Sequence, residues 1–360
     1  MPADDQKFMA RALDAAARHP HAAPNPRVGA VVVRGNEVIG TGWHRGPGTP
    51  HAEIDALEGI DAAGATLYLN LEPCIHEGLT PPCAPAVVDA GISRVVAAIP
   101  DPDPRVNGRG LDYLRGRGIA VTTGVLAAEA AALNESYLHH RRSGRPLVRL
   151  KLALTLDGRV AARDGSSRWI TGDEARRRVH EARARAGAVM VGAGTVVADD
   201  PILTARDVGA ARQPLRVVVD SSGRTSPDAR LFGAEGDVLI ATTPTAPHEA
   251  QTAWKEAGAD VVVLPEGRGG VDLRALLEDL GRRHLLDVYC EGGARLAASL
   301  LREGLVDRLE LHYGAKLVGE GPSIEDLGVS TMSEALTWSV AGVAHAGDDV
   351  MVSLTPPGRP

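Results

Sequence analysis

The sequence predicts an α/β protein built from two units, and three observations support this. The chain has 360 residues, more than one hydrophobic core usually organises. In the first half a hairpin pattern is followed by alternating helix and strand patterns, which is typical of a three-layer α/β/α sandwich. In the second half, apolar strands repeatedly end in Gly-rich or Ser-rich turns before a helix. A basic, turn-prone segment at 139–146 separates the halves, so we expect domains over residues 1–145 and 146–360.

The first half is expected to begin with an amphipathic helix and a hairpin. Apolar residues between Asp5 and Arg18 recur at helical spacing behind an acidic cap. Gly35 and Asn36 form the hairpin turn. The expected strands are 28–33, 37–42, 65–71, 94–99 and 119–123, and the further helices are 52–59, 84–90, 111–115 and an Ala-rich helix that ends near His140.

The second half is expected to open with a strand at 147–156. Strand alternation puts Leu150, Leu152 and Leu154 on one face and Lys151 on the other, so Lys151 points either to solvent or into a cleft. A helix that Thr171 or Asp173 could cap should run to residue 186. Later strands are expected at 188–191, 215–219, 238–241, 260–264 and 287–290, and the last leads into a helix.

The most specific chemical signal combines His51 and Glu53 with Cys74 and Cys83. Imidazole and thiolates bind zinc, and three protein ligands leave the fourth position open for water, as in catalytic sites. Glu53 is not needed as a ligand, so it can carry protons, as glutamate does in zinc nucleobase deaminases. The cysteines could instead be buried small hydrophobes, or His76 could complete a structural zinc site. Prolines before both cysteines make the joint pattern specific and favour the catalytic interpretation.

Two weaker signals indicate a dinucleotide. The Gly-rich turns at Gly292-Gly293 and at 192–195 could bring backbone amides close to phosphates. Ser221, Ser222 and Arg224 follow a strand end and could hold a ribose 2′-phosphate, which would favour NADPH over NADH. Neither turn is a full dinucleotide fingerprint, and glycine turns also end strands in α/β domains that bind no cofactor.

Composition excludes some classes of function. The net charge is −7 and aromatic residues make up 3%, whereas nucleic-acid binding usually needs a basic face with stacking aromatics. No apolar run is long enough to span a membrane, and residues 1–7 do not resemble a secretion signal. Three cysteines cannot form a disulfide framework. We therefore expect a cytoplasmic protein that binds neither nucleic acid nor membrane.

Taken together, these motifs resemble the bifunctional deaminase/reductase family of riboflavin biosynthesis. The resemblance covers nearly the whole chain, and its motifs occur in the family's order. They are Pro24-Asn25-Pro26-x-Val28-Gly29, His51-Ala52-Glu53, Glu72-Pro73-Cys74, Thr80-Pro81-Pro82-Cys83, Asp101-Pro102, Asn107-Gly108-x-Gly110, Lys151-Leu152-Ala153, Leu156-Asp157-Gly158, Trp169-Ile170-Thr171, Asp199-Asp200-Pro201, Leu203-Thr204 and Glu291-Gly292-Gly293.

The resemblance implies a cytidine-deaminase-like N-terminal domain and a dihydrofolate-reductase-like C-terminal domain. The first would use zinc, bound by His51, Cys74 and Cys83, to deaminate 2,5-diamino-6-(5-phosphoribosylamino)pyrimidin-4-one, with Glu53 as proton shuttle. The second would use NADPH to reduce the ribosyl side chain of 5-amino-6-(5-phosphoribosylamino)uracil to ribityl. A homo-oligomer formed through the reductase domain is also implied.

The resemblance further implies two groups of binding residues in the reductase. The NADPH site would comprise Ala153, Trp169, Thr195, Asp199, Ser221, Gly293, Ala294, Arg295, Leu296, Ala297, Ala298 and Ser299. The substrate would be contacted by Ser167, Arg183, Leu203, Arg206 and Glu291, and Lys151 would contact the reacting sugar. The two arginines suit the substrate phosphate.

Some positions depart from the family pattern. Leu79 stands where a basic residue is usual, Asp55 where Asn or His is common, and Ala294-Arg295 where Pro-Thr is frequent. These departures leave open a paralogue that acts on a related aminopyrimidine in a secondary pathway. Among other classes of function, the first half could be a nucleic-acid editor similar to tRNA adenosine deaminases. The reductase-like half fused to it argues against this function. A metal-stabilised binding protein without catalysis is the remaining alternative.

Overall fold

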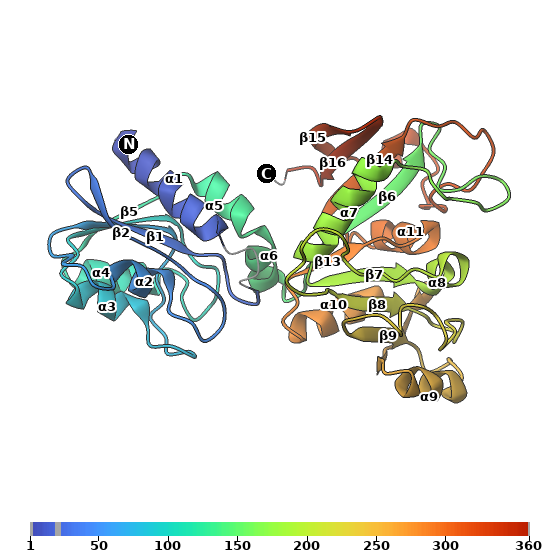
Figure 1. The fold of residues 1–360 in the computed structure, drawn as a ribbon, viewed down its shortest axis with the longest axis horizontal. Coiled ribbons are helices and arrows are strands. Elements are labelled where there is room, and N and C mark those ends of the chain that lie inside the picture. Colours follow the sequence, from blue (N-terminus) through green and yellow to red (C-terminus); the bar gives the residue numbers. More distant parts are fainter. Residues whose placement is uncertain (1–2, 19–22, 359–360) are drawn as a thin grey trace. The chain divides into compact units, whose positions relative to one another are not determined.

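A computed structural model describes residues 3–18 and 23–358 and divides the chain into two compact units, residues 1–144 and 145–360 (Figure 1). The predicted Asp5 to Arg18 helix is observed as α1 (Ala3–Ala17). Within the described ranges, no helix is both long and apolar enough to cross a membrane.

The first unit is a five-stranded sheet between two layers of helices, as predicted. Its strand order is β2-β1-β3-β4-β5, with β1 antiparallel to both neighbours and β3, β4 and β5 parallel. The strands are β1 (Gly29–Arg34), β2 (Glu37–Trp43), β3 (Thr66–Leu71), β4 (Arg94–Ile99) and β5 (Ala120–Thr123). The other helices are α2 (Ala52–Leu57), α3 (Cys83–Asp89), α4 (Arg109–Gly116), α5 (Ala127–Leu133) and α6 (Glu135–Ser143). One core lies between the sheet and α2, α3 and α4, and a second lies between the sheet and α1 and α5.

One prediction for this unit was wrong: the Ala-rich segment forms two helices, α5 and α6, instead of one. The break falls at Asn134, whose side-chain carbonyl accepts a hydrogen bond from Arg27 N and whose amide nitrogen donates one to Arg27 O. This pairing across 107 residues of sequence explains the break, because composition alone favours a continuous helix there.

Helix α2 lies unusually close to strand β2 because β2 carries glycines. A methyl group on Gly42 would lie 2.3 Å from Ala56 N and 2.4 Å from Ala52 O, both in the backbone of α2. Gly40 makes an equally close approach to Ala56 O, at 2.2 Å. Any larger side chain at these positions would push α2 away from the sheet.

The second unit is built on a nine-stranded sheet of order β10-β9-β8-β7-β13-β6-β14-β16-β15. All neighbours are parallel except the pairs that β16 forms with β14 and β15. The strands are β6 (Leu147–Thr155), β7 (Ala188–Gly192), β8 (Leu215–Val219), β9 (Val238–Thr242), β10 (Asp260–Val263), β13 (Asp287–Cys290), β14 (Arg308–Gly314), β15 (Ser339–Ala346) and β16 (Asp349–Thr355), with a separate small hairpin of β11 (Glu266–Gly267) and β12 (Gly270–Val271).

The helices of this unit flank the sheet. They are α7 (Asp173–Arg185), α8 (Ala193–Asp199), α9 (His248–Glu256), α10 (Leu273–Arg282) and α11 (Ala294–Arg302), with a short 3-10 turn η1 (Met332–Glu334). The five later strands predicted from sequence are all present, whereas β14, β15 and β16 were not foreseen. Those last strands complete one edge of the sheet, next to β6.

Strand β6 has the alternation expected from its sequence. Leu150, Leu152 and Leu154 are buried in the core beneath α10 and α11, and Lys151 lies on the opposite face. The start of the strand is fixed by Asp307, which accepts two hydrogen bonds from the Arg145 guanidinium and one from Val148 N.

We expect Gly42→Ala to destabilise the first unit by about 1–3 kcal/mol, because the added methyl must displace α2 from β2. Denaturant unfolding of the full chain, followed at a probe in the first unit, measures this. Gly116→Ala is the matched control, because a methyl group there meets nothing within 4 Å outside its own helix. Equal stabilities of the two variants would contradict the close packing of α2.

Candidate active sites

Three side chains in the first unit form a cluster suited to a metal ion. The Nδ1 atom of His51 lies 2.9 Å from Cys83 Sγ and 3.5 Å from Cys74 Sγ, and the two sulfurs are 3.6 Å apart. Their ligand atoms all lie within 4.8 Å of one another, and all three cysteines of the described chain are free. One imidazole and two thiolates at these separations fit a single tetrahedral zinc ion with one position left open.

The cluster is positioned by the starts of two helices. His51 is the residue before α2, and Cys83 is the first residue of α3, behind Pro82. Cys74 follows the end of β3, and Cys83 N donates a hydrogen bond to its sulfur. The Nε2 atom of His51 is 3.1 Å from Thr80 Oγ1, which leaves Nδ1 to face both sulfurs. Thr80 therefore orients the histidine in the way a second layer of contacts orients metal ligands.

Glu53 lies in the first turn of α2 and is 3% exposed. Burial raises the pKa of its carboxyl to about 7, and a charge on Cys74 acts in the same direction. The pKa of Cys74 is lowered, chiefly by its hydrogen bond with Cys83. A carboxyl that can exchange a proton near neutral pH is suited to general acid and base work.

The loop at 101–110, which carries two of the family motifs, is held by Glu72, a residue whose role the sequence did not reveal. Its carboxylate accepts hydrogen bonds from four backbone N–H groups, at Asp101, Gly108, Gly110 and Leu111. Gly110 has no room for a side chain, because a methyl group would lie 2.0 Å from Pro73 O. The loop is thus fixed against the segment that carries Cys74.

Leu79 and Asp55, the two positions of the first unit that depart from the family pattern, differ in their surroundings. Leu79 is 82% exposed in the loop between the cysteines. Asp55 accepts hydrogen bonds from Trp43 N and from both terminal nitrogens of Arg45, so it ties α2 to the end of β2. Asp55 therefore has a structural partner that the sequence pattern did not show.

Two adjoining cavities of about 510 and 550 Å³ lie at the carboxyl ends of the parallel strands of the second unit. Open α/β sheets place their ligands at this edge. The walls that the cavities share are Val160, Ser167, Thr195, Asp199 and Gly293. Two ligands bound in them would lie side by side, as transfer between a cofactor and a substrate requires.

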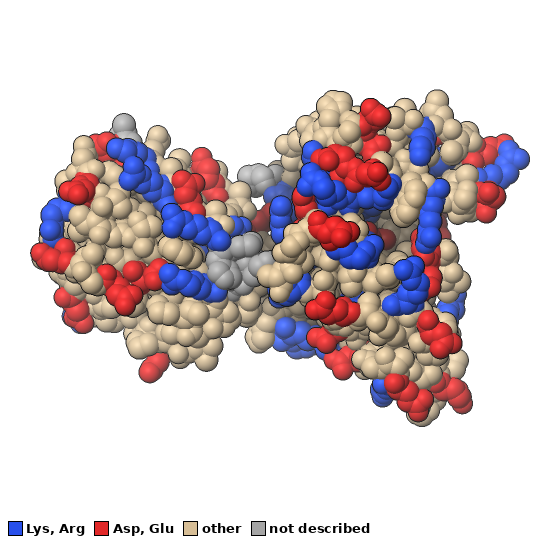
Figure 2. Space-filling model, in the orientation of Figure 1, with Lys and Arg blue, Asp and Glu red and all other residues tan. Residues whose placement is uncertain are grey.

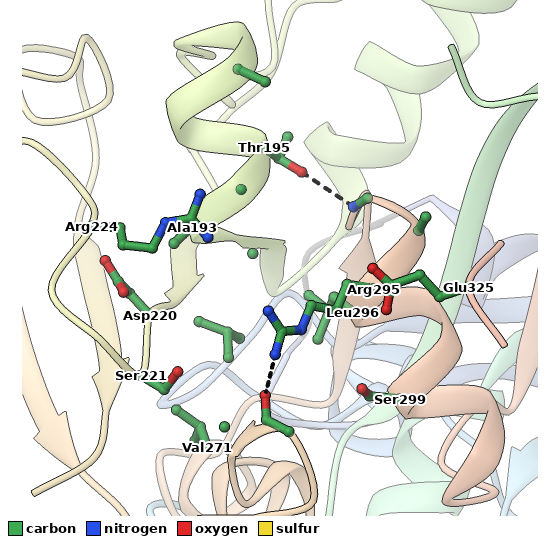
Figure 3. Close-up of a pocket in the computed structure, with 18 of the residues that line it drawn as sticks. Ala193, Thr195, Asp220, Ser221, Arg224, Val271, Arg295, Leu296, Ser299 and Glu325 are labelled. Carbon is green, nitrogen blue, oxygen red and sulfur yellow. Dashed lines mark hydrogen bonds between the residues drawn. The ribbon is translucent and has the colours of Figure 1, made fainter. Parts of the chain in front are cut away.

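The first cavity is shaped for a phosphate-bearing ligand (Figure 3). Gly293 is the residue before helix α11, and its N–H donates a hydrogen bond to Thr195 Oγ1. Asp220 accepts hydrogen bonds from three backbone N–H groups of the turn after β8, which presents Ser221 and Arg224. Arg224 and Arg295 extend toward the open space from opposite walls. A helix start and two guanidinium groups fit the phosphates of NADPH.

The second cavity is rich in cations. Its wall contains Lys151, Arg168, Arg176, His180, Arg183, Arg206 and Arg230, against the carboxylates of Asp199, Asp200 and Glu291. Arg183 donates to both oxygens of Glu291, with Nε to Oε1 at 2.5 Å and Nη2 to Oε2 at 3.0 Å, and also to Thr204 O. Arg206 donates to Thr204 Oγ1. This cavity suits a small phosphorylated ligand.

The structure brings most of the expected reductase residues to these cavities. Those at the first are Ser167, Thr195, Asp199, Ser221, Gly293, Ala294, Arg295, Leu296 and Ser299. Those at the second are Lys151, Ala153, Ser167, Trp169, Thr195, Asp199, Arg183, Leu203, Arg206, Glu291 and Gly293. Ala153 and Trp169, expected at the cofactor, line only the second cavity. Within the described ranges, Ala297 and Ala298 line neither cavity, and both are fully buried.

Sequence reasoning missed several residues of these walls. Arg268 comes from the hairpin of β11 and β12 and lines the first cavity, while Arg176 and His180 project from α7 into the second. Leu203 was expected at the substrate, but its backbone φ of +63°, an uncommon conformation for a residue other than glycine that occurs at binding loops, was not. Isolated arginines give no signal in a sequence with 39 basic residues.

Surface charge on the visible face is mixed. Figure 2 shows Lys and Arg among Asp and Glu over both units, with no single-sign region dominating that face. This distribution lacks the basic stripe that nucleic-acid binding proteins present.

Comparisons with known proteins agree with the geometry of both units. Residues 2–99 match the model of the cytidine and deoxycytidylate deaminase zinc-binding region, and residues 146–352 match the RibD C-terminal domain. The riboflavin biosynthesis protein RibD of Escherichia coli is 40% identical over 97% of this chain and 99% of its own length. RibD of Aquifex aeolicus is also 40% identical, over 97% of both chains.

Solved structures give the same result. RibD of Acinetobacter baumannii superposes with a TM-score of 0.89 at 37% identity, covering 98% of this chain and 99% of the other. A diaminohydroxyphosphoribosylaminopyrimidine deaminase/5-amino-6-(5-phosphoribosylamino)uracil reductase of Thermotoga maritima superposes with a TM-score of 0.86 at 34% identity, with the same coverage. These matches confirm the predicted fold class of both halves, and the chain belongs to the RibD family of bifunctional riboflavin biosynthesis enzymes.

Proposed function

We propose that this chain deaminates 2,5-diamino-6-(5-phosphoribosylamino)pyrimidin-4-one at the His51, Cys74 and Cys83 cluster, and then reduces the product's ribosyl side chain to ribityl in the paired cavities. The observation that carries the proposal is the presence, on one chain, of an open three-ligand cluster beside a buried carboxyl and of two adjoining cavities. Family membership establishes a zinc-dependent deaminase and an NADPH-dependent reductase.

In the deaminase, Glu53 moves the protons. His51, Cys74 and Cys83 would hold a zinc ion, which would supply the Lewis acidity that makes water nucleophilic near neutral pH. The Glu53 carboxylate accepts a proton from that water and donates it to the departing amine, the division of labour known for zinc nucleobase deaminases. Thr80 keeps the imidazole of His51 turned toward the sulfurs during this exchange.

In the reductase, this chain's residues bind and orient. NADPH supplies the hydride when it is bound along α11 and the turn after β8. Arg183 and Arg206 bind the substrate phosphate, which the cation-rich wall of the second cavity supports. Lys151 and Glu291 approach the reacting sugar from the sheet. Ser221 and Arg224 bind the 2′-phosphate and so select NADPH over NADH.

A paralogue acting on a related aminopyrimidine is the second candidate, and the exposed Leu79 favours it. A hydrophobic residue there removes a cation that could meet the substrate phosphate in the deaminase site. Comparing the turnover of the phosphorylated substrate with that of its dephosphorylated form separates the two candidates.

The assembly and location of the protein are also proposals. Val340 and Val343 are exposed on the edge strand β15, which supports a homo-oligomer formed through the second unit. The boundary between the two catalytic domains is proposed near residue 145, as the division into compact units supports. Three free cysteines support a reducing, cytoplasmic location.

We expect Glu53→Gln to retain zinc and to lose deaminase turnover by at least about 100-fold, because the amide cannot carry the proton. Metal analysis and deaminase assays of the full chain measure both effects. The reductase, assayed with the deaminated intermediate, serves as the folding control. Substantial remaining deaminase turnover in this variant would contradict the role of Glu53.

Thr80→Val should weaken zinc affinity by about 10–100-fold, because His51 loses the partner that orients its ring. Competition with a chelator gives the affinity. Thr252→Val is the matched control, since Thr252 is an exposed residue of α9 in the other unit. If both variants hold zinc as the natural chain does, Thr80 does not orient the ligand.

Arg224→Gln should raise the KM for NADPH by about tenfold or more and leave the KM for NADH nearly unchanged, because only NADPH carries the 2′-phosphate. Steady-state reduction with each cofactor tests this. Arg282→Gln, an exposed arginine of α10, is the control. An equal change for the two cofactors would assign Arg224 to another part of the dinucleotide.

A further inference from the structure

Lys151 lies between two carboxylates on the strands that flank β6. In the parallel pair of β6 and β14, Lys151 is in register with Glu310. On the other side, Cys290 pairs with Leu150, so Glu291 follows at the level of Lys151. Side chains in register on neighbouring strands share a face of the sheet. Glu310 and Glu291 therefore approach Lys151 from opposite sides.

Each of these carboxylates has its own arginine. Arg149, two residues before Lys151 on β6, donates from Nη1 to Glu310 Oε1 at 3.1 Å. Arg183 of α7 donates to both oxygens of Glu291. The result is a row of alternating charges, Arg149, Glu310, Lys151, Glu291 and Arg183, which we call the charged row. It ends at the second cavity, which Lys151, Glu291 and Arg183 line.

The Glu310 end of the charged row is largely buried and incompletely paired. The side chain of Glu310 is 17% exposed, and its second oxygen lies 3.8 Å from Nε2 of His312, which is 1% exposed. Among the described residues, neither ring nitrogen of His312 has a hydrogen-bond partner, and neither has the buried hydroxyl of Tyr289. Arg149 and His312 nevertheless lower the pKa of the Glu310 carboxyl against the effect of burial, so the group stays a carboxylate. A carboxylate held ionised in register with a lysine that lines a binding cavity can set the charge of that lysine.

We propose that Glu310 is a positioning residue of the reductase, which keeps Lys151 as an ammonium and holds it on the sheet face toward the second cavity. Lys151 lies in the middle of the charged row, with Glu310 in register beside it on β14. The proposal rests on the proposed function in one respect, the contact between Lys151 and the reacting sugar.

The charges around Lys151 determine in which direction its pKa should change when the charge of Glu310 is removed. Burial lowers the pKa of Lys151, Glu291 and Glu310 raise it, and Arg183 lowers it. Removing the charge of Glu310 leaves Glu291 alone against burial and Arg183, so the pKa of Lys151 should fall further. The titratable and charged groups that face this region are Glu310 and His312 of β14, Tyr289 of β13 and the adjacent Glu291, Arg149 of β6, and Arg183 and His180 of α7.

The direct test measures the protonation of Lys151 without relying on activity. The chain has four lysines, Lys7, Lys151, Lys255 and Lys316. The full-length protein is labelled with acetic anhydride across a pH series, and peptide mass spectrometry reports each lysine separately. In Glu310→Gln, the labelling midpoint of Lys151 should fall by about one pH unit or more. Lys7 and Lys255 should label as in the natural chain.

Further variants separate charge from packing. Glu310→Asp keeps the carboxylate and should restore most of the natural labelling midpoint. Arg149→Met removes a positive charge from the same row, so it should move the midpoint upward, opposite to Glu310→Gln. Glu320→Gln is the matched control, because the side chain of Glu320 is 74% exposed and pairs with Arg163 away from both cavities.

Kinetics then connect the labelling result to the reaction. Glu310→Gln should lower the reductase kcat by about tenfold or more, change KM less, and shift the alkaline limb of the kcat profile downward with the labelling midpoint. The deaminase on the same chain should keep its rate, which shows that the protein is folded. Glu310→Asp should recover much of the kcat.

An unchanged Lys151 midpoint in Glu310→Gln overturns the proposal, whatever happens to activity. A shifted midpoint with unaltered kcat and pH profile also overturns it, because Glu310 would then hold a lysine that the reaction does not use. If the natural chain does not reduce the proposed substrate, the proposed function fails. The labelling result still decides whether Glu310 holds Lys151 as an ammonium.

Discussion

In both units the chemistry depends on one constraint, that parallel strands place their carboxyl ends along the same edge of a sheet. In the first unit, the Cys74 segment follows β3 and the 101–110 loop follows β4, so the two lie side by side. Glu72 joins them, because its carboxylate accepts four backbone hydrogen bonds from the loop and the start of α4. In the second unit, β7, β8 and β13 end at the walls of the paired cavities. The reactive residues therefore come from distant parts of the chain, but their backbones are held by strand pairing.

Both sites also bury ionisable groups, which is costly unless their charges are matched. Glu53 is buried beside ligands that a zinc ion would neutralise. Lys151 is partly buried between Glu291 and Glu310, each paired with an arginine. The two units balance these charges in different ways, since the first would use a bound metal ion and the second uses the charged row of side chains. This difference explains why chelation should affect the deaminase alone.

The sequence was sufficient where chemistry needs particular residue types at short range. His51, Cys74 and Cys83 could be assigned because few other functions use that set, and Lys151 could be placed on its face from strand alternation alone. The remaining features depend on contacts between distant segments. The Asn134 break requires Arg27, and the partnership of Lys151 with Glu310 requires β14 to lie beside β6, a pairing across more than 150 residues. No local pattern encodes such neighbours.

The central claim is that one chain carries both steps in sequence, and mass spectrometry of the diaminopyrimidine ribosylamino phosphate after incubation with zinc-loaded protein tests it most directly. Without NADPH, the account predicts that the substrate exchanges one amino group for an oxo group and then remains unchanged. With NADPH, the product should additionally gain two hydrogens. No mass change in either reaction, or hydrogen gain without the amino-to-oxo exchange, would contradict the account.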